Sequence, residues 1–381
     1  MLLTFIFIGV ISVFLAMSLG ALFHLQWVRP LPTPILLDGT GGPARCSVVI
    51  AARDEQPRIE QTVRHLLAQQ HVQVEVITVD DRSSDGTGEI LKLLSKEDPR
   101  LRIIRVDRLP DGWLGKCHAC HLGAQAATGN WILFTDADCW LKPEVLARAL
   151  SVAEREGADH IALTPGLATS SLGTRAWHLA FLISMSNWIS GVNRDRPRAY
   201  FGLGAFNLVR ASAYAASGGY EALRLTVLDD VKLGLLLRRA GKKTRAFLGS
   251  GDVECHWGST LANMIQVMEK NYFAAVDFRS ATALGASLVG ILLLGAAVIG
   301  PLTGTVPGLA AGLAPFSFVL PAWFIARKLG WSAWAAALTP FIFPVLLYAM
   351  LNSIVVTLWQ GGVRWRETFY ALETLRKGIL R

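Results

Sequence analysis

Three long stretches of the chain carry no charged side chain, and they leave a polar segment between them. The charge-free stretches are residues 1–23, 281–326 and 329–363. Since about 20 apolar residues in a helix cross a hydrocarbon core roughly 30 Å thick, each stretch is long enough to span a membrane at least once. The pattern predicts four parts: an N-terminal transmembrane anchor over 1–28, a folded domain over 29–280, C-terminal membrane segments over 281–360 and a basic tail over 361–381.

Within residues 29–280, short apolar runs alternate with helical patterns. The runs that predict buried strands are residues 46–51, 74–79, 101–106, 131–134 and 160–163. Apolar residues spaced three and four apart predict the intervening helices, and Pro143 is a favoured first-turn residue for a helix over 144–155. Strands that alternate with helices predict an α/β fold with a mostly parallel, doubly wound sheet. Ligands of such sheets bind at the carboxyl ends of the strands.

The positions of the cations predict how the chain crosses the membrane. Arg29 is the first cation and follows the first apolar stretch, which favours an uncleaved span over a signal peptide. By the positive-inside rule, residues 29–280 then lie in the cytoplasm of a multi-pass protein of a bacterial-type inner membrane. Residues 281–326 predict two spans. For 329–363 a single span and a re-entrant segment broken at Pro340 and Pro344 both remain open, and the basic tail favours the second.

Composition narrows the class of protein. Of 381 residues, 52% are hydrophobic and 17% are charged, which excludes a disordered chain. The net charge is +8, yet residues 29–280 hold 30 basic and 27 acidic side chains and so predict no nucleic-acid partner. The excess of cations after Ala281, 7 basic against 2 acidic, favours contact with an anionic membrane leaflet.

The five cysteines allow three interpretations. Cys117, Cys120 and His121 match the pattern for covalent haem attachment, which requires an exported domain and conflicts with the predicted orientation. A zinc site that involves Cys139, Cys255 or His256 is the second interpretation. We favour the third, in which the cysteines are small buried thiols in a reducing compartment and form no disulfide.

Acidic and basic residues gather at the expected strand ends. The residues Ala51-Ala52-Arg53-Asp54-Glu55 follow the first strand, and Asp80-Asp81 end the second. Carboxylates here can accept hydrogen bonds from a base or a ribose. Ser84 or Asp85 alternatively caps the next helix.

Further along the chain, Asp136 and Asp138 follow the fourth strand, where they can hold a hard cation such as Mg²⁺ or Mn²⁺ together with a diphosphate. Lys116 begins a predicted helix and either faces phosphate oxygens or is simply solvated. Asp229-Asp230 begins a helix that runs to Arg239 and either complements the helix dipole or supplies a general base.

As an ordered set, these residues resemble the family 2 inverting glycosyltransferases, in particular the membrane-bound branch that glycosylates lipids and includes ceramide glucosyltransferases, hopanoid-associated and carotenoid glycosyltransferases. The resemblance covers residues 46 to about 277 and implies an A-type glycosyltransferase fold, a nucleotide-diphosphate sugar donor and a divalent metal. Position by position, it implies that Ala51, Arg53 and Glu55 line the nucleotide and that Asp81, with Asp80 as the alternative, faces the base. It implies that Asp136 and Asp138 hold the metal and the diphosphate, with Asp138 preferred as direct ligand, and that Asp230 is the catalytic base.

One departure and one further similarity refine this resemblance. Processive members carry Q-x-x-R-W, whereas this chain reads Gln266-Val267-Met268-Glu269-Lys270 and has no Arg-Trp pair there. This favours transfer of a single sugar, with Lys270 as a candidate replacement for the missing arginine. Residues 361–366 resemble the basic aromatic segment that follows the last span in lipid-modifying relatives.

The resulting hypothesis is inverting, metal-dependent transfer of one sugar, expected from a UDP-sugar, to a hydroxyl of a membrane lipid. Residues 172–192 are expected either to form an interfacial helix that guides the lipid head group or to be a core helix. The alternatives are a polyprenyl-phosphate sugar transferase and a non-catalytic nucleotide-sugar-binding membrane scaffold. The sequence leaves the sugar, the lipid and the oligomeric state open.

Overall fold

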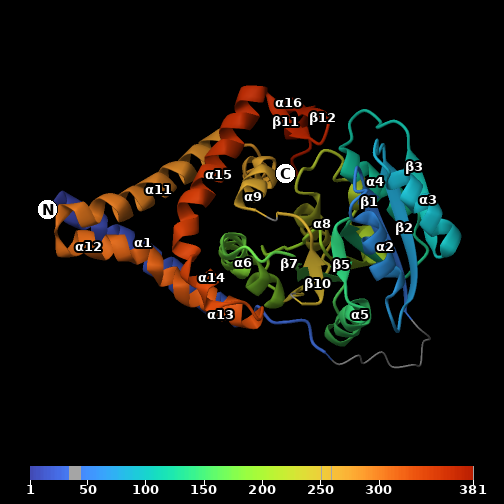
Figure 1. The fold of residues 1–381 in the computed structure, drawn as a ribbon, viewed down its shortest axis with the longest axis horizontal. Helices are drawn as coiled ribbons and strands as arrows, with labels where there is room; N and C mark the ends of the chain where they lie inside the picture. The colour runs from blue at the N-terminus through green and yellow to red at the C-terminus, as the bar shows by residue number, and fades with distance from the viewer. Residues whose placement is uncertain (34–43, 250, 259, 381) are drawn as a thin grey trace. The chain divides into compact units, whose positions relative to one another are not determined.

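The computed structural model describes residues 1–33, 44–249, 251–258 and 260–380, and the chain falls into two units (Figure 1). The sheet unit comprises Val28–Ala168, Gly191–Trp257 and Lys377–Arg381. The helical unit comprises Met1–Trp27, Thr169–Ser190 and Gly258–Arg376.

A seven-stranded sheet forms the centre of the sheet unit, with the strand order β3-β2-β1-β4-β8-β6-β9. The strands are β1 (Arg45–Ala52), β2 (Gln73–Asp81), β3 (Leu101–Val106), β4 (Trp131–Asp136), β6 (His160–Thr164), β8 (Asn207–Arg210) and β9 (Thr244–Leu248). Only β8 runs antiparallel to its neighbours. The five predicted strands and the mostly parallel α/β sheet are confirmed, whereas β8 and β9 were missed.

Apolar side chains explain why these strands lie in the middle of the unit. Residues 46–50 of β1 and 131–135 of β4 are buried, as expected for parallel strands covered on both faces. The helices that follow the strands are α2 (Ile59–Leu67), α3 (Thr87–Glu97), α4 (Gly115–Ala126), α5 (Val145–Glu156), α7 (Ala211–Ala216), η2 (Gly219–Glu221) and α8 (Asp229–Arg239). A side chain at Gly123 of α4 would overlap Val49, so this glycine allows α4 to pack closely on β1.

The register of the sheet places the predicted site residues at one edge. Ala51 lies opposite Asp136 in the β1–β4 pair, and Ala52 lies opposite Asp80 in the β1–β2 pair. A smaller sheet continues from this edge. It consists of β5 (Cys139–Leu141), β10 (Val253–Cys255) and β7 (Gly166–Leu167), in the order β5-β10-β7.

Within the described part of the helical unit, four helical segments are long and apolar enough to cross a membrane: Leu2–Leu25, Ser280–Thr303, Val306–Lys328 and Thr339–Gln360. They consist of α1 (Leu2–Leu25), α11 (Ser280–Ile299), η3 (Gly300–Thr303), α12 (Val306–Leu313), η4 (Ala314–Phe318), α13 (Val319–Lys328) and α15 (Thr339–Gln360). The remaining elements are α6 (Leu172–Asn193), α9 (Leu261–Glu269), α10 (Asn271–Ala275), α14 (Ala333–Ala337), β11 (Gly362–Trp365), β12 (Thr368–Ala371) and α16 (Leu372–Lys377).

The structure corrects one expectation about the last apolar stretch. We expected Pro340 and Pro344 to break it, but α15 continues through both prolines for 22 residues. Pro340 lies at the start of the helix, where its missing N–H has no intrahelical partner to lose. Pro344 removes one hydrogen bond without ending the helix. The chain geometry therefore gives no reason for a re-entrant turn there, and the number of crossings stays a prediction.

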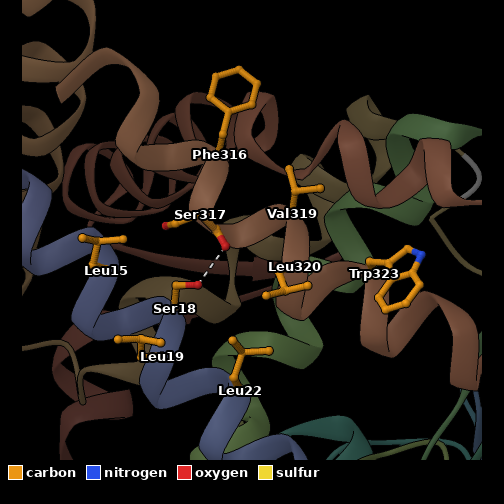
Figure 2. A pocket seen from close by; sticks show the side chains of 9 residues that line it. All are labelled: Leu15, Ser18, Leu19, Leu22, Phe316, Ser317, Val319, Leu320 and Trp323. Atoms are coloured by element: carbon orange, nitrogen blue, oxygen red, sulfur yellow. Dashed lines mark hydrogen bonds between the residues drawn. The ribbon is translucent and has the colours of Figure 1, made fainter. Parts of the chain in front are cut away.

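An apolar cavity of about 600 Å³ lies between α1 and the η4–α13 segment of the helical unit (Figure 2). Leu15, Leu19 and Leu22 line it from α1. The hydroxyl of Ser18 donates a hydrogen bond to the carbonyl oxygen of Ser317, 2.8 Å away. This bond satisfies a polar side chain that is buried among apolar ones.

Helix α6 fits the core-helix interpretation along most of its length. Trp177 is buried, Phe181 and Met185 are half-buried, and Trp188 is 38% exposed. A role of α6 in guiding a lipid head group stays a prediction.

Candidate active site

The carboxylate of Asp81 lies at the carboxyl end of β2 and is held in place by its neighbours. It accepts two hydrogen bonds from the guanidinium of Arg82, at 2.8 and 3.0 Å. A side chain at Gly115 would overlap Asp81 Oδ2, so the first turn of α4 packs directly on this carboxylate. Asp80 points elsewhere and accepts the backbone N–H of Ser83 at 3.1 Å. Of the two candidates, Asp81 is therefore the one that adjoins α4.

Lys116, in the first turn of α4, pairs with the acidic residues. Its ammonium nitrogen lies 2.6 Å from Asp136 Oδ1 and 3.9 Å from Asp229 Oδ2. Burial on its own lowers the pKa of Lys116, but the carboxylates of Asp136, Asp229 and Asp230 outweigh it and hold the pKa well above its usual value. Lys116 is thus a charged member of the acidic cluster, and the interpretation of this residue as a simply solvated lysine is wrong.

The glycine segment (residues 202–204) connects Asp136 with Asp230. The backbone N–H of Gly204 donates to Asp230 Oδ2 at 2.7 Å, and the N–H of Val231 donates to Oδ1 at 2.8 Å. A Cβ atom at Gly204 would lie 2.5 Å from Asp136 Oδ2. The carboxylates of Asp136 and Asp230, 94 positions apart in the sequence, therefore lie against the same residue.

Asn207 at the start of β8 holds the glycine segment against α8. Its side-chain oxygen accepts the N–H of Leu203 at 3.1 Å, and its side-chain nitrogen donates to the carbonyl oxygen of Asp230 at 3.4 Å. The ring of His160 bonds Asn207 at 3.1 Å and Thr244 at 3.1 Å. Because His160 is fully buried, its pKa falls to about 4, and the ring is neutral at physiological pH.

The adjacent acids of α8 are in different environments. Asp229 is buried and accepts a hydrogen bond from the hydroxyl of Tyr220 at 3.1 Å. Asp230 is only half-buried, and both of its oxygens are oriented by backbone N–H groups. Of the two acids, Asp230 is therefore the one whose carboxylate is accessible to a substrate.

Asp138 lies just beyond β4 in a crowded acidic environment. Burial, together with the negative charges of Asp136 and Glu55, raises its pKa to about 7. Crowded carboxylates of this kind fit a hard divalent cation, since the cation relieves both the repulsion and the desolvation. Glu55, which we had assigned only to the nucleotide, thus lies near enough to affect the charge of the predicted metal ligand.

The residues after β1 are ordered by hydrogen bonds to the β2–α3 loop. Asp54 has a left-handed backbone (φ 54°) and accepts the N–H of Ser84 at 2.8 Å. The N–H of Glu55 donates to the hydroxyl of Thr87 at 2.9 Å. The Nε atom of Arg53 lies 3.8 Å from Asp54 Oδ2. Ala51 and Arg53 therefore flank the same sheet edge as Asp136, and their contact with a nucleotide stays a prediction.

Asp85 has the structural role that we considered for it. Its Oδ1 accepts the N–H of Thr87 at 3.0 Å, in the first turn of α3, and its Oδ2 accepts the N–H of Gln56 at 3.0 Å. Gly86 is the N-cap residue of α3, and Asp85, one position before it, bonds the first turn of the helix and anchors a loop.

All five cysteines are buried and free, which confirms that they form no disulfide. Cys117 and Cys120 lie within α4, with 0% and 3% of their surfaces exposed. A haem would need both sulfurs at an accessible surface, so the haem interpretation is wrong. Cys139 and Cys255 lie beside Asp138.

In the helical unit, Lys270 directly follows Glu269, which stands at the arginine position of the Q-x-x-R-W motif. Its ammonium nitrogen lies 4.2 Å from the ring centre of Trp365, in the basic aromatic segment, and 2.9 Å from Asn271 Oδ1. Its role as a phosphate partner stays a prediction.

Comparison with solved structures identifies the class of this fold. The structure is similar to the mannosyltransferase PcManGT from Pyrobaculum calidifontis, in complex with GDP-Man and Mn²⁺, with a TM-score of 0.57 and 18% identity over 94% of this chain and 99% of that one. The sheet unit has the α/β fold of the A-type glycosyltransferases, as the sequence predicted.

Sequence comparison then gives the family. Residues 47–218 match the family Glycosyl transferase family 2, and the chain carries a domain of this family. The chain is 25% identical over 214 residues to a 4,4'-diaponeurosporenoate glycosyltransferase of Staphylococcus haemolyticus, 54% of this chain and 55% of that one. It is 36% identical over 111 residues to the succinoglycan biosynthesis protein ExoO of Rhizobium meliloti, 29% of this chain and 30% of that one. The matches thus span about half the length of the first relative and less of the second.

Proposed function

We propose that this protein transfers a single sugar from a nucleotide-diphosphate sugar to a hydroxyl of a membrane lipid, with inversion at the anomeric carbon. The observation that carries the proposal is the convergence of Asp136 and Asp230 on Gly204. A carboxylate pair at a strand end and a separate, oriented carboxylate on a helix are what a metal-bound donor and a general base require.

In the proposed mechanism Asp138 and Asp136 hold Mg²⁺ or Mn²⁺, and Lys116 adds a fixed positive charge for the diphosphate. When bound, the metal offsets the charge that develops on the leaving diphosphate. PcManGT, which shares the fold, was solved with GDP-Man and Mn²⁺, which supports a divalent metal here. It also makes GDP-sugars donors to test beside the UDP-sugars that we expect. Arg53, Glu55, Ala51 and Asp81 are proposed to contact the nucleotide.

Asp230 is the proposed general base. Its two backbone hydrogen bonds fix the orientation of the carboxylate, which prepares it to accept a proton. The acceptor hydroxyl gives its proton to Asp230 while its oxygen bonds to the anomeric carbon. The bond from that carbon to the diphosphate oxygen breaks on the opposite face, so the configuration inverts.

The lipid acceptor and the membrane location rest on separate observations. Among the residues that the structure describes, four segments are long and apolar enough to cross a membrane, and one relative is named as a 4,4'-diaponeurosporenoate glycosyltransferase. We propose a multi-pass protein of a bacterial-type inner membrane with the sheet unit in the cytoplasm, since Arg29 follows the first apolar segment.

The test begins with membranes that contain the full chain, incubated with labelled UDP- and GDP-sugars, and with mass spectrometry of the extracted lipids. Asp230→Asn should lower turnover at least a hundredfold and leave donor binding within about threefold, because a general base contributes about 10²–10⁴ to rate. Asp107→Asn, an exposed residue paired with Arg105, is the matched control and should behave as wild type.

Each alternative predicts a different result. Full turnover by Asp230→Asn would remove Asp230 from the role and favour a polyprenyl-phosphate acceptor, since a phosphate needs no base. Donor binding without transfer to any lipid extract would favour the non-catalytic scaffold.

A further inference from the structure

Cys139 and Cys255 face each other across the antiparallel pair β5–β10 and lie in direct register. The N–H of His256 donates to the carbonyl oxygen of Asp138 at 3.0 Å, one position beyond the pair. This bond places the two cysteines at a non-hydrogen-bonded position of the ladder, where opposite side chains approach most closely. Two short strands therefore hold both sulfurs on one side of the small sheet.

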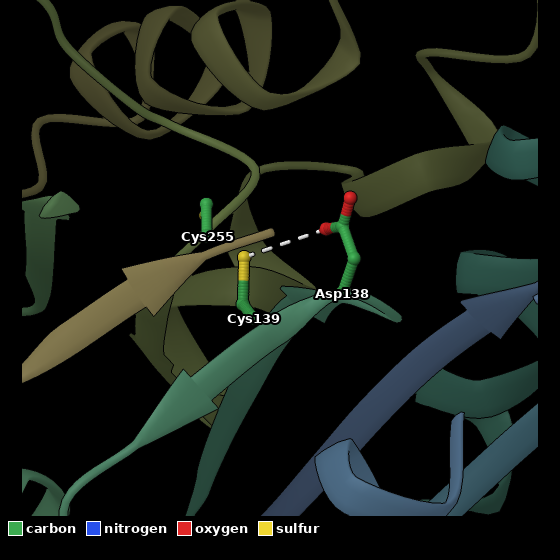
Figure 3. Close-up of side chains that lie close together, drawn as sticks. All are labelled: Asp138, Cys139 and Cys255. Atoms are coloured by element: carbon green, nitrogen blue, oxygen red, sulfur yellow. Dashed lines mark hydrogen bonds between the residues drawn. The ribbon is translucent and has the colours of Figure 1, made fainter. Parts of the chain in front are cut away.

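The carboxylate of Asp138 completes a group of three donor atoms. One oxygen of Asp138 and the sulfurs of Cys139 and Cys255 all lie within 4.8 Å of one another (Figure 3). The thiol of Cys139 donates to Asp138 Oδ1 at 3.7 Å, so sulfur and carboxylate already point toward each other.

This set of donor atoms differs chemically from the carboxylates of Asp136 and Glu55. Two sulfurs and one oxygen suit Zn²⁺ and other thiophilic cations, whereas Mg²⁺ and Mn²⁺ prefer oxygen alone. Both thiols are buried. A zinc ion would form two Zn–S bonds and displace the two protons to solvent. Three protein ligands leave the fourth tetrahedral position for water.

We propose that Asp138, Cys139 and Cys255 form an inhibitory binding site for a thiophilic divalent cation such as Zn²⁺. Occupancy of this thiol site takes the Asp138 carboxylate away from the catalytic cation and thereby stops sugar transfer. The binding step stands on the geometry of the three donors alone. The inhibition rests on the proposed function, in which Asp138 holds the catalytic metal.

The binding test uses Co²⁺ as a spectroscopic probe with the purified full chain in detergent under reducing conditions. Wild type should bind one Co²⁺ with a thiolate-to-metal charge-transfer band, and Zn²⁺ should abolish the band at one equivalent. Cys139→Ala and Cys255→Ala should each lose it, and Cys46→Ala, which removes a buried thiol of β1, should keep it. No thiolate band in wild type, or a band that survives in both variants, would overturn the site.

The inhibition test adds Zn²⁺ to the transfer assay with Mn²⁺ held constant. The Zn²⁺ concentration for half inhibition should rise at least tenfold in Cys139→Ala and Cys255→Ala and stay unchanged in Cys46→Ala. Equal inhibition of all variants would separate the site from catalysis. Because the cobalt spectra need no donor or acceptor, a failed proposed function leaves the binding result intact, and the two failures are distinguishable.

Discussion

Replacing a glycine by alanine at either end of the glycine segment distinguishes an effect on stability from an effect on function. The structure predicts that Gly202→Ala mainly destabilises the fold and that Gly204→Ala mainly weakens donor binding. At Gly202 the new Cβ would overlap the carbonyl oxygen of Asp230 and lie 3.1 Å from Asn207 Oδ1. The obstructing oxygen of Asp230 belongs to the backbone of α8, so it cannot rotate away. At Gly204 the new Cβ would lie 2.5 and 3.2 Å from the two oxygens of Asp136, a side chain that can rotate.

The size of each effect on stability depends on whether the atoms that the new methyl group meets can move. Overpacking against fixed atoms costs about 1–3 kcal/mol, and for Gly202→Ala we expect the upper end. At about 2–4 °C per kcal/mol for a domain of 150–250 residues, the melting temperature should fall by about 6–12 °C. Neither glycine has a positive φ, so alanine brings no backbone strain. Gly204→Ala should therefore cost about 1 kcal/mol or less, and the lower entropy of its unfolded chain offsets part of that.

For donor binding, we expect Gly204→Ala to be the more damaging of the two substitutions. Rotation of Asp136 away from a methyl at Gly204 breaks its 2.6 Å contact with Lys116 and displaces a predicted ligand of the catalytic cation. We expect Gly204→Ala to lower donor affinity at least tenfold with a nearly unchanged melting temperature.

The assay is a thermal melt of the full chain in detergent, followed by calorimetric titration with a donor that supports turnover. Gly285→Ala is the control, because nothing lies within 4 Å of that position. Wild-type donor affinity in Gly204→Ala, or a Gly202→Ala protein as stable as Gly285→Ala, would refute the reasoning.

Two further predictions concern buried ionisable side chains. His160, whose pKa lies near 4 when folded and about 6.5 when unfolded, makes the folded state lose stability as pH falls below 6.5. The loss should reach about 2 kcal/mol between pH 8 and pH 5. His160→Gln should flatten this part of a denaturation profile, and parallel profiles would contradict it. Lys116→Met should cost about 2 kcal/mol, which is less than the about 3–5 kcal/mol for breaking a fully buried pair, because the side chain of Lys116 is 23% exposed. The same change in an Asp229→Asn background should cost clearly less in a double-mutant cycle, and equal costs would show that the pair is not coupled.

The sequence determined the secondary structure and the class of the fold because the signals are local. Short apolar runs predicted the first five strands of the seven-stranded sheet, apolar residues three and four apart predicted the helices between them, and charge-free stretches predicted the long apolar helices. The missed strand β8 is only four residues long and antiparallel, and it follows a glycine-rich segment. Its identity depends on pairing with β4 and β6, which no local pattern encodes.

Tertiary structure alone decided which of the candidate residues meet. The resemblance assigned Asp136 and Asp230 to one site, but only the structure shows that their contact passes through the backbone of Gly204. It left Lys116 between phosphate binding and solvation, and the ion pair with Asp136 decided against solvation. Residues such as Asn207 and His160 carry no motif, since they act by filling hydrogen bonds that exist only once β8, the glycine segment and α8 have packed together. Local preference fixes each element, whereas a site depends on distances between elements, and only the packed sheet determines those distances.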